Sequence, residues 1–189
     1  MRKLILTLSA ILVAIVGLQA QHVFDKGDMA INAGIGLVGS YGFYPSIEAS
    51  FEMGVIPTGE VGLVSFGGEV GWKYSKYSWD YDWYDNYDFD YHFHQFIIGG
   101  RAAWHLHTFE SDKYDVYGGV GIGLKIWTDK SYDYDYNHDK YIETVDSRSD
   151  VYGQVFVGGR MMLKDNFGIF AELGYGPISS IRAGVTLKL

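Results

Sequence analysis

Residues 180–189, SIRAGVTLKL, alternate between apolar and other side chains at every position after the first. One set is Ile181, Ala183, Val185, Leu187 and Leu189, and the other is Arg182, Gly184, Thr186 and Lys188. A period of two is that of a β-strand whose two faces meet different surroundings. These residues therefore predict a strand with one apolar and one polar face.

The same alternation recurs upstream, with turn-like breaks between the segments. We predict eight strands, over residues 28–39, 45–56, 61–76, 91–106, 114–128, 150–163, 167–176 and 179–189. The face opposite the apolar one is rich in glycine and carries Glu48, Glu52, Glu69, Arg101, Lys125, Arg160, Glu172, Arg182 and Lys188. The acids and bases of this set nearly cancel.

Alternation alone does not say which face points inward, so a soluble barrel with an apolar interior competes with a membrane barrel that is apolar outside. An eight-stranded barrel has an interior just wide enough for side chains. Glycines beside long charged residues fit that space, and balanced charge fits it because buried ions need partners. Both features favour the membrane barrel, and they predict a lumen closed by ion pairs.

The connections and the aromatic residues favour the same choice. Residues 57–60, 107–113 and 164–166 are short connections that fall at one end, while 75–92 and 129–150 are long and fall at the other. Membrane barrels of the outer-membrane type have short periplasmic turns and longer extracellular loops. On the apolar face the long-loop end holds Trp72 and Tyr175, and the turn end holds Trp104 and Phe167, as two interfacial girdles require.

The sequence resembles the small eight-stranded outer-membrane β-barrels of the OmpX/OmpA transmembrane type over about residues 26–189. The resemblance includes the C-terminal assembly signal of that family, carried here by Arg182, Gly184, Leu187 and Leu189, with Leu189 in place of the usual aromatic residue. It implies an all-β, eight-stranded antiparallel up-and-down transmembrane β-barrel in the outer membrane of a Gram-negative-type bacterium. The partners it implies are outer-membrane lipid and the barrel assembly machinery, with the chain as a monomer.

The N-terminal residues have the features of a secretory signal. Arg2 and Lys3 precede an apolar run from Leu4 to Leu18, and a small residue follows at Ala20. We therefore predict a signal peptide over residues 1–20 and the barrel domain over residues 21–189. Cleavage would change the formal net charge from −8 to −10 because it removes two basic residues, and this charge argues against nucleic acid as a partner.

Two acidic, aromatic-rich segments lie in the long connections. Residues 78–94, SWDYDWYDNYDFDYHFH, include five Asp and eight Trp, Tyr or Phe, and the two connections each sum to −4. One interpretation is that the strands continue as hairpins beyond the membrane, with aromatic pairs across strands and Asp keeping the edge soluble. The alternative is a calcium site of Asp133, Asp135, Asn137 and Asp139, although His138 and Thr144 stand where an EF-hand loop has Gly and Glu.

Other chemistry has less support in the sequence. His92 with His94, and His105 with His107, form two His-x-His pairs at opposite ends of one strand, so they cannot share a zinc ion, and we interpret them as rim or turn residues. Ser78 and His94 could meet near the outer interface, but no catalytic motif links them. We predict no enzyme and no cofactor.

The predicted function lies in the loops, because function on a rigid scaffold is carried by its loops. We expect a cell-surface interaction protein, in adhesion or envelope defence, with an extracellular protein or glycan as ligand. A purely structural barrel or a narrow, porin-like channel is the main alternative. A lipid-modifying enzyme of the outer membrane is the third.

Overall fold

The fold is taken from a computed structural model, which describes residues 22–39, 43–79, 89–107, 111–135 and 140–189. In residues 77–79, 89–91, 131–135 and 140–144 the backbone alone is described. The predicted signal peptide lies outside the described residues.

Eight strands follow one another along the chain, and a single turn of 3-10 helix, Gly59–Val61, precedes the third. The strands are β1 (Met29–Leu37), β2 (Ser46–Pro57), β3 (Gly62–Trp79), β4 (Phe89–Leu106), β5 (Tyr114–Asp135), β6 (Lys140–Lys164), β7 (Phe167–Tyr175) and β8 (Ile181–Lys188). Each strand pairs antiparallel with the next, and β1 pairs with β8, so the sheet closes on itself. The predicted eight-stranded antiparallel up-and-down barrel is confirmed. None of the described helical residues forms a segment long and apolar enough to cross a membrane.

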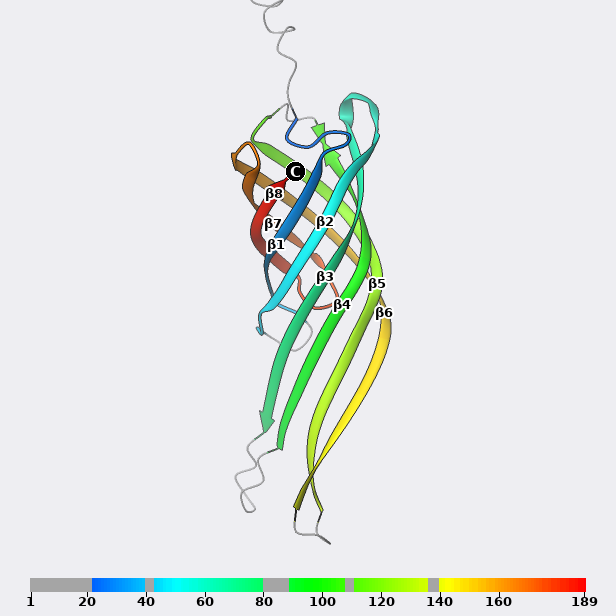
Figure 1. The fold of residues 1–189 in the computed structure, drawn as a ribbon, viewed down its shortest axis with the longest axis vertical. Coiled ribbons are helices and arrows are strands. Elements are labelled where there is room, and N and C mark those ends of the chain that lie inside the picture. Colours follow the sequence, from blue (N-terminus) through cyan, green and yellow to red (C-terminus); the bar gives the residue numbers. More distant parts are fainter. Residues whose placement is uncertain (1–21, 40–42, 80–88, 108–110, 136–139) are drawn as a thin grey trace, which may run out of the picture.

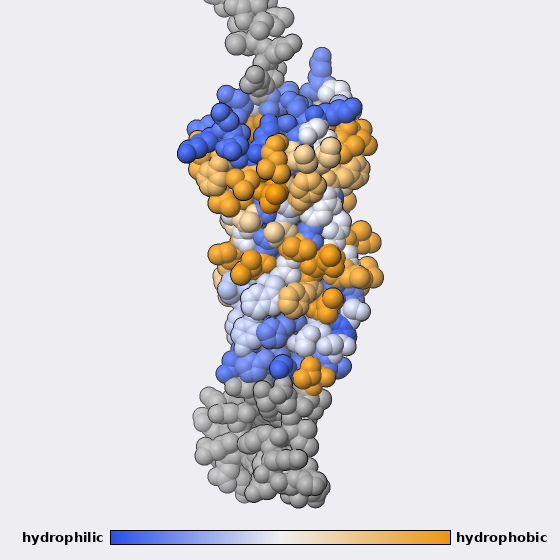
Figure 2. All heavy atoms as spheres, in the orientation of Figure 1, coloured by the Kyte–Doolittle hydropathy of each residue, from blue (hydrophilic) through white to orange (hydrophobic). Residues whose placement is uncertain are grey.

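The register places the apolar and polar faces as the alternation predicts. Glu172 pairs with Arg182 and both are buried inside the barrel, while the next pair toward the turns, Ala171 and Ala183, faces outward. Ile169 and Val157 are 42% and 63% exposed on the outer surface. The predicted parity of the strands is therefore confirmed, and apolar side chains gather on the outside of the barrel, as the face drawn in Figure 2 shows.

The barrel has two unlike ends, and these are named here for their connections. The β2–β3, β4–β5 and β6–β7 connections, the described residues before β1 and the C-terminus lie at one end, the turn end, which is uppermost in Figure 1. At the other, the loop end, β3, β4, β5 and β6 run on well beyond the remaining strands. This four-stranded continuation is called the extension.

The extension corrects the predicted strand boundaries. β5 and β6 stay paired as far as Asp135 and Lys140, and β3 and β4 as far as Trp79 and Phe89, so half of residues 75–92 and most of residues 129–150 belong to strands. Within the described residues the backbone continues the pairing of the strands, as the hairpin interpretation predicts. In these segments Tyr and Asp alternate with the same period of two as the residues of the barrel strands, and this alternation favours continued pairing.

Candidate functional site

The lumen holds a cluster of ionisable side chains near the turn end. The guanidinium group of Arg160 bonds the carboxylate of Glu52 and lies 3.1 Å from that of Asp115. His105, which is fully buried, lies between the same two acids, with Nδ1 3.0 Å from Asp115 and Nε2 3.4 Å from Glu52. The hydroxyl of Ser65 lies nearer to Nε2, at 2.9 Å, so the ring is held from both sides. This group is called the turn-end cluster.

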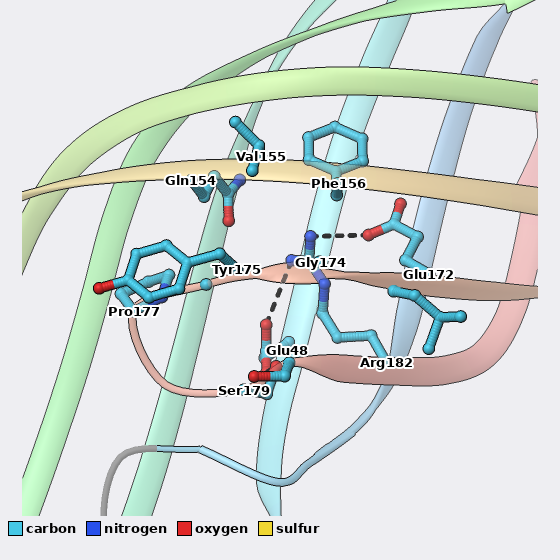
Figure 3. Close-up of a pocket in the computed structure, with 13 residues that line it drawn as sticks. Glu48, Gln154, Val155, Phe156, Glu172, Gly174, Tyr175, Pro177, Ser179 and Arg182 are labelled. Carbon is cyan, nitrogen blue, oxygen red and sulfur yellow. Dashed lines mark hydrogen bonds and ion pairs between the residues drawn. The ribbon is translucent and has the colours of Figure 1, made fainter.

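A second set, the central cluster, lies farther along the barrel axis toward the loop end. Arg182 on β8 donates from Nη1 to Glu48 at 3.1 Å, and its Nη2 lies 2.6 Å from Glu172 (Figure 3). Nη1 also donates to Glu69 at 3.1 Å. Arg101 on β4 bonds the other oxygen of Glu172 at 2.7 Å. Strands that are far apart around the sheet are thus joined across the interior.

Tyrosine hydroxyls add to the carboxylate contacts and connect the clusters. Tyr117 donates to Glu172 at 2.9 Å while its ring lies 5.0 Å from the guanidinium carbon of Arg160. Tyr152 donates to Glu69 at 2.7 Å. Buried charges are tolerated when they are paired and hydrogen-bonded, and here the pairing fills the lumen.

The turn end of the lumen is covered by the segment that precedes β1. Phe24 is buried, its ring lies 4.6 Å from that of His105, and the guanidinium carbon of Arg160 lies 5.0 Å from it. His107 donates from Nε2 to the backbone carbonyl of Phe24 at 3.1 Å, and its ring stacks on that of His22 at 3.9 Å. Residues 22–24 therefore pack over the turn-end cluster, and this segment is called the cover.

The loop end of the lumen is narrowed by the connection between β7 and β8. Ile178 and Ser179 are buried, and Ser179 donates to Glu48 at 2.5 Å. Lys73 donates to the backbone carbonyl of Ile178 at 3.1 Å. Beside this connection a cavity of about 10 Å³, lined by Gln154, Tyr175 and Arg182 among others, has room for about one water (Figure 3). The described lumen thus holds no continuous wide path.

The predicted lumen set divides in two. The two clusters contain Glu48, Glu52, Glu69, Arg101, Arg160, Glu172 and Arg182. The other two residues lie elsewhere: Lys188 pairs with Asp28 at 2.7 Å on the partly exposed rim, and Lys125 lies over the ring of Trp127 at 4.2 Å. Lys125 and Lys188 were counted in the predicted charge balance of the lumen, but they belong to neither cluster.

Several lumen residues were absent from the predicted set. His105 was interpreted as a rim or turn residue, and this is wrong because its ring lies fully buried in the turn-end cluster. Asp115, Tyr117, Tyr152 and Lys73 were not named for the lumen. Their positions along β3, β5 and β6 give them the same parity as the residues that were named, so extending the alternation would have found them.

The extension presents a different kind of surface. β6 pairs with β7 only from Val155 to Lys164, so residues 140–154 have β5 on one side and no paired strand on the other within the described part of the chain. Residues 145–151 are all exposed, Val151 to 71%. An unpaired edge presents free N–H and C=O groups to another chain.

The candidate calcium residues give no geometry to judge. Asn137 and Asp139 lie outside the described residues, and the side chains of Asp133 and Asp135 are not described. Among the described side chains, no three acids or histidines are grouped as a metal site requires. For the Ser78 and His94 pair, His94 packs against the rings of Trp72 and Tyr74, and the side chain of Ser78 is not described.

The chain matches no protein-family model and no curated protein. The chain is an eight-stranded antiparallel β-barrel. Among solved structures it is similar to Ail, the attachment invasion locus protein of Yersinia pestis, with 13% identity over 86% of this chain and 95% of that one and a TM-score of 0.43. A structure of Ail with the heparin analogue sucrose octasulfate gives 14% identity, 86% and 96% coverage and a TM-score of 0.42.

The N-terminal β-barrel domain of Pseudomonas aeruginosa OprF is also similar, with 13% identity over 87% of this chain and 98% of that domain and a TM-score of 0.40. Because these identities and TM-scores are low, the fold is assigned from the strand pairing of this chain and not from the similar structures.

Proposed function

We propose that the barrel spans the outer membrane of a Gram-negative-type bacterium and anchors a surface-interaction module outside the cell. The outer surface supports this location, because residues such as Ile98, Ile122 and Val155 are 58%, 66% and 56% exposed and would otherwise face water. Buried salt bridges inside and apolar side chains outside are the arrangement of a membrane barrel. The turn end would face the periplasm and the loop end the outside.

The extension is the interaction module in this proposal, and the unpaired edge of β6 is the observation that supports it most. Residues 140–154 form an edge without a paired strand, which another chain can extend by one strand, with backbone hydrogen bonds giving affinity and alternate side chains giving specificity. The connection from 129 to 150 has a net charge of −4, which favours a partner with basic side chains. The ligand we propose is an extracellular protein with an exposed basic strand.

The filled lumen makes a transport role the less favoured alternative. Arg182, Arg160 and their acidic partners occupy the space through which a solute would pass. A purely structural barrel is the second alternative, and it gives no reason for strands that continue so far beyond the barrel. The proposal includes no catalytic centre.

A trimmed barrel tests this function. The register allows Tyr77–Tyr91 and Ser131–Thr144 each to be replaced by Asn-Gly, because Lys76 pairs with His92 and Lys130 with Val145. Asn-Gly favours the two-residue turn that joins antiparallel strands. The trimmed barrel keeps only residues 145–154 of the unpaired β6 edge, so bacteria displaying it should adhere to immobilised extracellular-matrix proteins markedly less than bacteria displaying the full barrel.

The control is the amount of folded barrel at the surface, measured by the heat-dependent mobility of the protein on gels. Equal adherence of bacteria with the full and trimmed barrels, at equal surface amounts, would leave the structural barrel as the better explanation.

A further inference from the structure

The pairing of β6 with β5 fixes which backbone groups the unpaired edge of β6 presents. The amide of Met162 donates to the carbonyl of Lys113 at 2.8 Å, and the β5–β6 register continues from this pair without a shift. Hydrogen-bonded and non-hydrogen-bonded pairs alternate along an antiparallel ladder. Even-numbered residues of β6 therefore bond β5. Odd-numbered residues direct their N–H and C=O groups toward β7 or, from Val155 toward the loop end, toward the unpaired edge.

The side chains along this edge differ between the two faces of the strand. Odd-numbered residues have their side chains on the outer surface, where Val151 is followed toward the loop end by Ser149 and Ser147. The hydroxyl of Ser147 lies 3.3 Å from that of Thr128 on β5. Even-numbered residues lie on the lumen face: Asp146, Arg148 and Asp150, all exposed, then Tyr152 and Gln154, both buried. An added strand would meet hydroxyl groups on one face and charges on the other.

Asp146 is the charged residue of this edge that has the least compensation. The register places it directly opposite Asp129 on β5, and like charges in directly opposite positions are unfavourable. Oδ1 of Asp129 is buried without a hydrogen-bond partner, and neither acid forms an ion pair with a described side chain. A basic side chain on an added strand opposite Asp146 would lie close to both carboxylates.

The next two charges on the same face have different neighbours. Arg148 faces Trp127 on β5, with its guanidinium carbon 5.1 Å from the ring centre, so no acid lies directly opposite it. Asp150 lies opposite Lys125, so a neutral residue of an added strand suffices there. An acid opposite Arg148 would be favourable, and a base there unfavourable. The edge thus favours an order of charges and not a uniformly basic strand.

We propose that the strand which binds this edge is antiparallel to β6 and carries a basic residue opposite Asp146 and an acidic residue opposite Arg148. The inference rests on the proposed function and specifies its partner. An antiparallel strand would continue the line of β7, which ends at Tyr175 opposite Val155, and antiparallel pairing is slightly more stable per residue. Read from its N-terminus, the partner strand has Asp or Glu, one outward residue, and then Lys or Arg. Thr or Ser suits the outward positions opposite the serines.

Two cyclic β-hairpin peptides test the order of charges. The free strand of the first reads Val-Gln-Thr-Glu-Thr-Lys-Val, which places Glu opposite Arg148 and Lys opposite Asp146. The second has Glu and Lys exchanged and therefore the same composition. The wild-type barrel, refolded in neutral detergent, should bind the first peptide about tenfold more tightly at low salt, measured by fluorescence anisotropy of the labelled peptides.

Two variants of the barrel complete this test. D146R/R148E exchanges the charges of the edge and should reverse the preference between the peptides. The matched control is K164E/D165R, which exchanges a lysine and an aspartate at the turn end and should keep the preference. If D146R/R148E does not fold, Asp146→Asn and the salt titration of the wild-type protein decide, because the preference should fall in both.

Ser149→Pro separates this inference from the proposed function. The N–H group of Ser149 points to the unpaired edge, so proline blocks strand addition there and leaves the β5–β6 hydrogen bonds in place. The variant should bind neither peptide, and bacteria displaying it should adhere less than bacteria displaying Ser149→Ala. Unchanged adherence, at equal amounts of folded barrel, would overturn the proposed function. Lost adherence with equal binding of the two peptides to the wild-type protein would overturn the order of charges alone.

Other outcomes also overturn the inference. They are tighter binding of the second peptide to the wild-type protein, or a preference that high salt leaves unchanged. Self-association of the wild-type barrel that Ser149→Pro abolishes, measured by sedimentation, would make a second copy of the chain the occupant of the edge. The trimmed barrel keeps residues 145–151, so its preference between the peptides should persist even where adherence is weakened.

Discussion

Arg182 has the most acidic surroundings of any described cation in the lumen, because its guanidinium group contacts Glu48, Glu69 and Glu172. We expect Arg182→Met to lower the free energy of unfolding by about 3–5 kcal/mol, since it leaves three buried carboxylates with fewer partners. The measurement is urea unfolding of the refolded barrel, followed by its heat-dependent mobility on gels.

Lys188→Met is the control for this change. Lys188 pairs with Asp28 on the rim, where both side chains are 27% exposed, so its loss should cost no more than about 1 kcal/mol. Equal losses in the two variants would show that the central cluster adds no more stability than a surface pair.

Parity along the strands predicted seven of the acids and arginines that lie in the two clusters, because each residue's face follows from its position in a strand, but Asp115 was not named. It was not sufficient to predict their pairing. Glu52 meets Arg160 across the barrel, and neither strand order nor spacing says which inward side chains meet across a filled interior. His105 was misjudged because a histidine near a strand end has no composition signal that separates a rim residue from a buried one.

Among the elements, the cover formed by residues 22–24 has a testable role. Phe24 shields His105, which is fully buried, from the turn end. We expect Phe24→Ala to make His105 reactive toward diethyl pyrocarbonate, detected residue by residue with mass spectrometry, because the replacement leaves an opening beside the imidazole.

Ile178→Ala is the matched change at the loop end of the lumen, where it shortens the buried side chain of the β7–β8 connection. His105 should stay unreactive in this variant, because the central cluster still lies between the opening and the ring. An unreactive His105 in Phe24→Ala, or equal reactivity in both variants, would contradict the assignment of the cover.

The sequence predicted the number of elements better than their lengths. β5 and β6 continue to Asp135 and from Lys140, whereas the predicted strands end at 128 and begin at 150. The predicted bounds stopped where the composition becomes acidic, since Asp is uncommon in strands. The alternation of Tyr and Asp nevertheless favoured continued pairing, which was one of the two interpretations. The cover before β1 had no signal, because its few residues have no period of their own.

For the whole molecule, the filled lumen predicts electrical behaviour. We expect the wild-type barrel in a planar bilayer to show no large steady conductance. Both clusters, the cover and the β7–β8 connection occupy the lumen through which ions would pass. Rare, small openings are compatible with this structure. A stable conductance like that of an open porin would show that the lumen rearranges in the membrane.

The ion pairs of the lumen also bear on the order in which the barrel is made. Glu48 precedes its partner Arg182 by 134 residues, and Glu52 precedes Arg160 by 108. Every acid of β2 and β3 is therefore synthesised and delivered before the arginine that neutralises it, and β1 gains its second neighbour only when β8 arrives. An unfinished sheet carries uncompensated carboxylates on its inner face, and such a face is costly to place in lipid. The carboxylates of β2 and the β1–β8 seam thus gain their partners at the same stage. A chain that stalls before β8 therefore does not form a stable partial barrel in the membrane.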